Sequence, residues 1–126
     1  MFLDSNLTHA VNCWAYGTKM KILFKGSKKA VEAAAFVSDE DLTCLQILCR
    51  KKNYSRFRIH FKDISILSDN PSFKLPKDLA NIQTILFVNT MKDDHMVLVF
   101  PDFQTRDLIW QSLQWFMKNA LDLLQG

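Results

Sequence analysis

The sequence predicts a mainly β protein with helices at both ends, in which a partly open antiparallel barrel or sandwich of about seven strands is closed by a C-terminal helix. Three observations predict this fold. Residues 18–100 contain short segments in which apolar and polar residues alternate, turn-forming residues separate these segments, and residues 102–124 have helical periodicity. A chain of 126 residues is by default one domain, here residues 1–126.

Composition narrows the class of protein. The apolar share and the low glycine and proline content are typical of a folded domain, and no segment is apolar for long enough to span a bilayer. The start of the chain lacks the basic residues and apolar run of a secretory signal, so we expect a cytoplasmic protein. Three cysteines without framework spacing fit reduced thiols in that compartment. The net charge of +3 does not identify a partner by itself.

A short helix is predicted at residues 5–16. Asp4 or Ser5 can cap its start and Gly17 can end it. Its apolar face would comprise Leu7, Ala10, Val11 and Trp14. We interpret this helix as a lead-in that packs on the sheet. A membrane-surface helix is the competing interpretation, but the polar face has no lysine or arginine.

Seven strands are predicted between the helices, at about residues 19–25, 33–38, 42–49, 57–61, 63–67, 82–89 and 96–100. In the first strand Met20, Ile22 and Phe24 point to one face, because successive residues of a strand alternate. Lys19 and Lys21 point to the other face. Most strands follow one another through short turns, which predicts an antiparallel meander.

The C-terminal helix at residues 102–124 is the longest predicted element. Asp102 can cap its first free N–H groups, and Gly126 follows its end. One stripe of the helix comprises residues at steps of three and four: Arg106, Trp110, Leu113, Met117, Ala120 and Leu124. We expect this stripe to cover the open side of the sheet, with Trp110 and Leu113 as structural anchors.

Basic residues gather at the first and third turns. In an antiparallel meander successive turns alternate between the two ends of the sheet, so these two turns lie at one end and the acidic turn Asp39-Glu40-Asp41 lies at the other. The basic rim would comprise Lys19, Lys21, Lys25, Lys28 and Lys29 together with Arg50, Lys51, Lys52, Arg56 and Arg58. Such a field attracts anions to one end of the domain. The competing interpretation is that turn lysines only keep the surface soluble.

The chain resembles a pleckstrin-homology (PH) domain over about residues 17–124. The resemblance rests on the strand order, on Asp63-Ile64 at the end of a strand that follows a basic turn, and on Trp110, which stands where the family has a near-invariant tryptophan. Segments 17–21, 36–45 and 108–116 are most similar to PH domains of delta-type phospholipases C and to apicomplexan relatives. Those relatives include the acylated PH protein that binds phosphatidic acid and the inner-membrane-complex subcompartment proteins.

The resemblance implies a binding site for phospholipid headgroups. Family members that bind phosphoinositides tightly have a lysine on strand one, matched here by Lys21 or Lys25, and a basic-x-arginine motif on strand two. Val31-Glu32-Ala33 stands in place of that motif, so the arginine that holds a phosphate with two bonds is missing. The candidate headgroup-binding residues are Lys19, Lys21, Lys25, Lys28, Lys29, Lys51, Lys52, Arg56 and Arg58. We expect them to bind phosphatidic acid or a phosphoinositide with weak isomer selectivity.

Other chemistry has little support in the sequence. Cys44, Cys49 and His60 lack a fourth ligand for a metal site, and no nucleophile has an evident base and orienting acid. We therefore expect no catalysis, metal or cofactor, and no nucleic-acid partner, because Phe57 has core-facing parity. The sequence predicts a peripherally membrane-associated module that binds anionic phospholipid. The alternative is a protein-interaction or scaffold module that kept the fold and lost the lipid.

Overall fold

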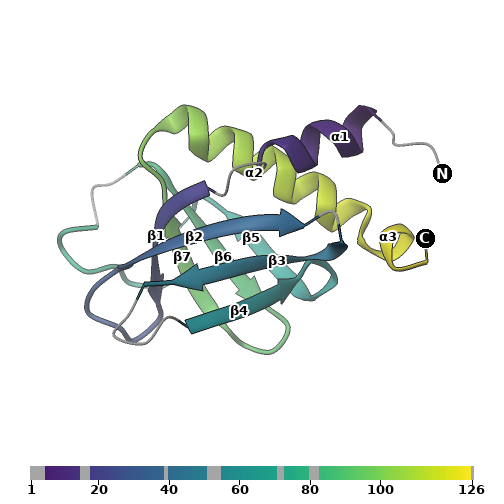
Figure 1. Cartoon of the computed structure of the whole chain (residues 1–126). Coiled ribbons are helices and arrows are strands. Elements are labelled where there is room, and N and C mark those ends of the chain that lie inside the picture. The colour runs from purple at the N-terminus through teal and green to yellow at the C-terminus, as the bar shows by residue number, and fades with distance from the viewer. Residues whose placement is uncertain are drawn as a thin grey trace.

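The computed structural model describes residues 5–14, 18–38, 40–50, 55–70, 73–79 and 83–125. In this part of the chain, seven antiparallel strands form one curled sheet in the order β4-β3-β2-β1-β7-β6-β5, with helices before and after it (Figure 1). The strands are β1 (Thr18–Phe24), β2 (Val31–Ser38), β3 (Asp41–Cys49), β4 (Ser55–His60), β5 (Ile64–Ser68), β6 (Ile85–Thr90) and β7 (His95–Val99). The predicted fold class is confirmed.

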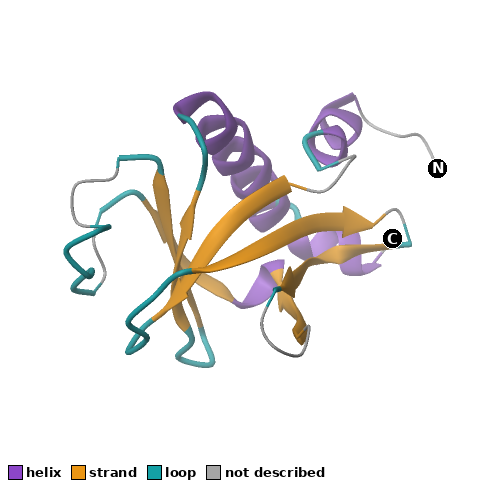
Figure 2. Cartoon of the chain, turned by 60° about the vertical axis from the view of Figure 1, so that its left-hand side comes forward, coloured by secondary structure: helices purple, strands orange, loops and turns teal. Residues whose placement is uncertain are grey.

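The inner face of the curled sheet holds the main core. As predicted for β1, Met20 and Ile22 are buried in this core while Lys19 and Lys21 are exposed. The helix α2 (Phe103–Lys118) lies along the open side of the sheet, as Figure 2 shows. Its Phe116 stacks on Phe61 of the short 3-10 helix η1 (Phe61–Asp63), with ring centroids 4.5 Å apart. The helix therefore closes the core that the strands leave open.

A second, smaller core lies on the outer face of β1, β6 and β7. Leu23 of β1 is buried there, although it shares its face with the exposed lysines of the same strand. Residues 73–79 provide the cover, since Leu79 is buried and the ring of Phe73 meets that of Phe87 edge-on at 5.4 Å. Residues 73–79, within the connection between β5 and β6, are thus a packed wall on the outer face of the sheet.

The C-terminal helix differs from its prediction in extent and in the face that it buries. Asp102 caps it as predicted, because its carboxylate accepts the backbone N–H of Thr105 at 2.7 Å. The helix stops at Lys118 instead of running to residue 124, and after Asn119 a second helix, α3 (Ala120–Gln125), follows. The side-chain amide of Asn119 donates to the carbonyl of Trp115 at 2.8 Å, which is typical of a helix end.

The buried face of α2 consists of Ile109, Ser112, Leu113 and Phe116. Leu113 is fully buried, as predicted for an anchor. Trp110 is partly buried and packs against the margin of this core, and its role as an anchor stays a prediction. The guanidinium of Arg106, also on the predicted stripe, lies over the Trp110 ring, 5.3 Å from its centroid.

The N-terminal helix α1 (Ser5–Asn12) is shorter than the predicted range 5–16 and packs on α2. Its last turn tightens, because the N–H of Trp14 donates to Val11 and not to Ala10. The freed carbonyl of Ala10 accepts the hydroxyl of Ser112 at 2.9 Å, and the same Ser112 oxygen accepts the indole N–H of Trp14 at 2.8 Å. Trp14, at 1% exposure, is therefore an integral part of the core.

Candidate functional site

The structure divides the predicted headgroup-binding residues between two surfaces. Lys25, Lys28 and Lys29 are exposed on the turn between β1 and β2, called the first turn below. Lys19, Lys21, Arg56 and Arg58 are exposed on the outer face of the sheet, away from the core. Lys51 and Lys52 lie outside the described residues. The single basic rim of the prediction therefore becomes a turn cluster and an outer-face cluster.

The first turn lies at the same end of the sheet as the end of β3. The backbone N–H of Arg50, directly after β3, donates to the carbonyl of Glu32 at 2.8 Å, next to the start of β2. The N–H of Lys25 donates to the carbonyl of His95 at 2.9 Å, so the turn between β6 and β7 also lies beside the first turn. The predicted meander geometry is thus confirmed at this end of the domain.

The first turn presents its cations to solvent. Gly26 adopts a φ of 90°, in the left-handed region that glycine populates without strain, and the N–H of Ser27 closes the turn on the carbonyl of Phe24 at 2.9 Å. Among the described residues, no ion pair involves Lys25, Lys28 or Lys29. The neighbouring β6–β7 turn exposes Met91, whose side chain is 71% accessible. An apolar tip therefore stands beside unpaired cations.

The space behind the first turn is filled by aromatic rings. Phe24 and Phe57 pack against each other with centroids 5.6 Å apart, at the inner side of the sheet. A pocket of about 300 Å³ beside them lies between β4 and the β6–β7 turn. Its charged lining residues comprise the cations Arg58 and Lys92 and the carboxylates Asp63 and Asp94, together with His60. This smaller pocket therefore has little net attraction for a phosphate.

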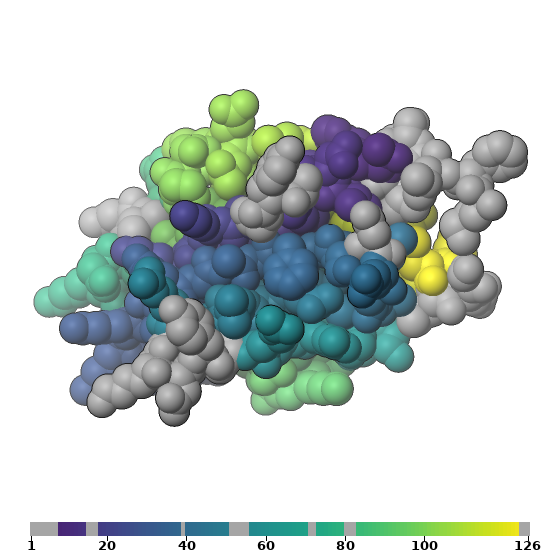
Figure 3. Space-filling view, viewed as in Figure 1, coloured from purple at the N-terminus to yellow at the C-terminus, as the bar shows by residue number. Residues whose placement is uncertain are grey.

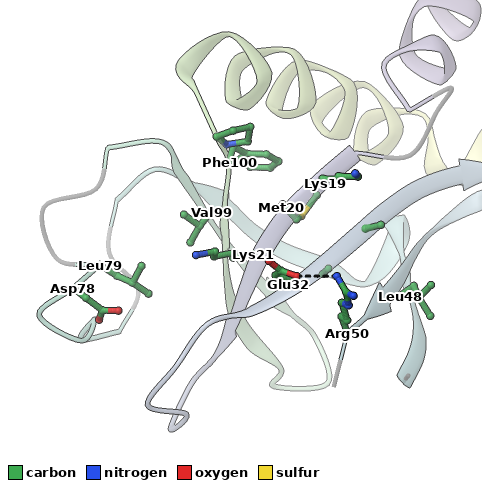
Figure 4. Close-up of a pocket in the computed structure, with 13 residues that line it drawn as sticks. Lys19, Met20, Lys21, Glu32, Leu48, Arg50, Asp78, Leu79, Val99 and Phe100 are labelled. Carbon is green, nitrogen blue, oxygen red and sulfur yellow. Dashed lines mark hydrogen bonds and ion pairs between the residues drawn. The ribbon is translucent and has the colours of Figure 1, made fainter. Parts of the chain in front are cut away.

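A larger pocket, of about 780 Å³, lies on the outer face and is called the outer groove below (Figure 4). Lys19 and Lys21 of β1 stand at one side and Arg50, after β3, at the other, while Ala34 of β2 lies among the lining residues. The wall formed by residues 73–79 contributes Leu79. Two of the predicted headgroup residues therefore line a cavity that the interpretation as a single rim did not anticipate.

The thiol of Cys44, which is buried beside the acidic turn, has low reactivity. Burial, together with the neighbouring Asp41 carboxylate that accepts from the thiol, raises the pKa of Cys44 to about 11. The hydroxyl and N–H of Thr43 donate to Asp41 and hold the pKa of that carboxyl below its usual value. Cys44 therefore stays a protonated thiol at neutral pH and is a poor nucleophile.

Within the described ranges, no helix is both long and apolar enough to cross a membrane. In the same part of the chain, no group of three or more histidine, cysteine, aspartate or glutamate side chains is arranged to hold a metal ion.

No family model matches the chain, and no curated protein matches it. Solved structures do. Inner Membrane Complex Sub-compartment Protein 3 from Toxoplasma gondii is 14% identical, with a TM-score of 0.63 over 96% of this chain and 90% of that one. The PH domain from PfAPH is 12% identical, with a TM-score of 0.64 over 94% of each chain. The human C-terminal PH domain of FGD3 is 14% identical, with a TM-score of 0.60 over 82% of this chain and 84% of that one.

These likenesses define the class of fold. The chain has the PH fold, as its resemblance predicted, and apicomplexan proteins are among its structural neighbours. At such low identity the likeness extends to the backbone and not to the ligand. The ligand must therefore be inferred from this chain's own surfaces.

Proposed function

We propose that this domain is a non-catalytic module that is recruited to anionic phospholipid membranes through its first turn. The observation that supports this proposal best is the exposure of Lys25, Lys28 and Lys29 without an ion pair in the described part of the chain. A basic residue near an anionic bilayer contributes about 1 kcal/mol, so three of them favour the membrane by roughly 3 kcal/mol. The association is peripheral and weakens as salt rises.

The exposed side chain of Met91 adds an apolar contribution to the same end of the domain. Met91, at the tip of the β6–β7 turn, is 71% accessible and belongs to neither core cluster of the described residues. Burying an apolar side chain in the interfacial region of a bilayer releases water and orients the domain. The first turn then lies in the plane of the headgroups.

Headgroup choice follows from the aromatic rings behind the turn. The Phe24–Phe57 pair fills the interior where a headgroup would need donors, and the smaller pocket beside it is balanced in charge. Lysine ammonium groups attract any phosphate but discriminate weakly among isomers. The domain therefore prefers a phosphomonoester such as phosphatidic acid, or total negative charge, over a particular inositol phosphate.

Vesicle co-sedimentation at two salt concentrations tests the proposal. The double variant Lys28→Glu/Lys29→Glu removes two of the three favourable charges and adds two unfavourable ones, so its partition onto phosphatidic acid vesicles should fall by at least about 30-fold. The matched control Lys62→Glu/Lys118→Glu makes the same charge change at two exposed lysines on η1 and α2. This control should retain most binding, since neither lysine belongs to the first turn. Equal losses in the two variants would refute a localised site.

A second candidate function is protein interaction. It is favoured by the position of the larger pocket, which lies on the outer face of the sheet and not behind the first turn. A wild-type domain that ignores anionic vesicles at low salt would make this second function the better one.

A further inference from the structure

We propose that the outer groove binds an extended acidic peptide segment of a partner protein, with one apolar side chain of that segment inserted between β1 and β3. This site is separate from the first turn and goes beyond membrane recruitment. Figure 3 shows that the outer face of β2 and β3 lies open below α1 and α2. The groove on it has a volume of about 780 Å³, enough for several residues of a peptide.

The groove exists because its floor is a methyl group. Across the sheet, Ala34 of β2 is paired with Lys19 of β1 on one side and with Leu48 of β3 on the other. Directly paired side chains on one face of a sheet lie about 5 Å apart, so long side chains flank a position where only a methyl group stands. The partner's apolar anchor fits above Ala34, beside Leu48.

Cations surround this apolar floor. The next cross-strand row places Lys21 beside Glu32, and Glu32 pairs with the Arg50 guanidinium at 3.4 Å. Further out, Arg56 is paired with Leu48 and Arg58 with Gln46, and both arginines are exposed. Among the described residues, the outer-face side chains of β1 to β4 and the adjoining Arg50 present the cations Lys19, Lys21, Arg50, Arg56 and Arg58 against the carboxylate Glu32. The wall of residues 73–79 adds the carboxylate Asp78 and the exposed cations Lys74 and Lys77. This excess is complementary to an acidic chain that crosses the strands.

The shape and lining of the groove favour a peptide over the other polyanions. A flat bilayer meets the long side chains and the wall of residues 73–79 before it reaches Ala34. A nucleic acid would bring phosphates against Glu32 and Asp78, and the aromatic ring in the lining, Phe100, is buried and offers no face for base stacking. A peptide can alternate carboxylates with one apolar anchor, so it satisfies both the rim and the floor.

Fluorescence anisotropy with defined peptides tests this proposal. The probe is a labelled glutamate-rich peptide of about eight residues with a central leucine, long enough to cross the groove at about 3.3 Å per residue. Two control peptides are compared with the probe. In one the leucine is replaced by serine, and in the other lysines alternate with the glutamates so that the peptide is charge-neutral. Wild-type protein should bind the probe at least about tenfold more tightly than either control.

Variants of the protein locate the binding. Ala34→Leu fills the floor without changing charge, at a position that is half-buried and outside the core, and should weaken probe binding by about tenfold. Lys19→Glu/Lys21→Glu should do the same through charge, which keeps the test valid even if Ala34→Leu fails to fold. The matched control Lys28→Glu/Lys29→Glu should bind the probe normally, whereas Ala34→Leu should bind vesicles normally.

Several outcomes would overturn the proposal. One is a probe that binds wild-type protein no better than its charge-neutral control. Another is an affinity that Ala34→Leu leaves unchanged although the variant is folded by circular dichroism. Loss of vesicle binding in Ala34→Leu would reassign the groove to lipid, and a single-stranded oligouridine of equal charge that outcompetes the probe would reassign it to nucleic acid. Because vesicles are assayed separately, failure of this proposal leaves the membrane proposal standing.

Discussion

The hydrogen bonds between Trp14 and Ser112 make the N-terminal helix a testable part of the fold. Ser112→Ala removes the hydroxyl that accepts the Trp14 indole N–H at 2.8 Å and donates to the Ala10 carbonyl at 2.9 Å. Both groups are then buried without a partner. An unsatisfied buried polar group costs about 1–3 kcal/mol, so we expect Ser112→Ala to destabilise the domain by roughly 2–4 kcal/mol.

A double-mutant cycle isolates the indole bond. In Trp14→Phe the indole N–H is absent, so a second change of Ser112→Ala leaves only the Ala10 carbonyl unpaired. The cost of losing the hydroxyl should then be smaller by about 1 kcal/mol or more than in the wild-type background. Urea unfolding of all four proteins, followed by far-ultraviolet circular dichroism, measures this difference without relying on tryptophan fluorescence.

The cycle also decides whether α1 belongs to the folded unit. If the cost of Ser112→Ala is the same in both backgrounds, the indole bond contributes nothing and α1 only rests on α2. If Trp14→Phe and Ser112→Ala each leave the unfolding midpoint unchanged, the domain is stable without this contact. Either result would refute the reasoning from burial, since Trp14 is 1% exposed.

Two further predictions concern α2. Phe116→Ala empties a fully buried position stacked on Phe61 and should lower the free energy of unfolding by about 3–5 kcal/mol. Trp110→Ala should cost less, because the Trp110 ring is only partly buried. Urea unfolding measures both variants, and the reverse ranking would show that the helix docks through Trp110. The N–H of Thr105 lowers the pKa of Asp102, so the cap is stabilising above the unfolded-state pKa and its contribution is lost as pH falls through the folded-state pKa. Asp102→Asn should therefore weaken the acid dependence of the melting temperature below about pH 5, and an unchanged pH profile would contradict this.

The strands and their faces could be predicted from the sequence because parity is a local property. Met20 and Ile22 point inward and Lys19 and Lys21 outward, as their alternation indicates. The burial of Leu23 could not be predicted in this way, because its cover is Leu79, which is distant in the sequence. Alternation predicts the face of the sheet on which a side chain lies, but it does not predict whether another segment of the chain will bury that face.

Helical periodicity is compatible with either of two apolar stripes as the buried face of the C-terminal helix. The predicted stripe and the observed buried face share Leu113 and Ala120 and differ in whether Trp110 or Phe116 lies beside them. Both stripes satisfy steps of three and four. The choice between them depends on the angle at which the helix crosses the sheet, which is a tertiary property. Tertiary packing thus gave the central position to Phe116.

The arrangement of the candidate site could be predicted only in part, and which of its residues bind a ligand stays a prediction. Two of its lysines were assigned to a rim by their nearness in sequence to the first turn, although the strand alternation already placed Lys19 and Lys21 on the outer face. Parity also predicted that Phe24 shares the face of Met20 and Ile22, and the structure has it there, packed on Phe57. The outer groove needed the pairing of Ala34 with Lys19 and Leu48, which depends on strand register and could not be obtained from local pattern.

Register also changes the meaning of the missing strand-two arginine. Ala33 stands where the family motif would end, and it is 8% exposed and points into the main core, so an arginine there would bury a charge. We therefore expect every soluble inositol phosphate to bind weakly, in order of total charge and with a steep loss of affinity as salt rises. Titration calorimetry of several isomers at two salt concentrations measures this. Sub-micromolar, salt-resistant binding of one isomer would contradict it and would point to Arg56 or Arg58 as the donor of two parallel bonds.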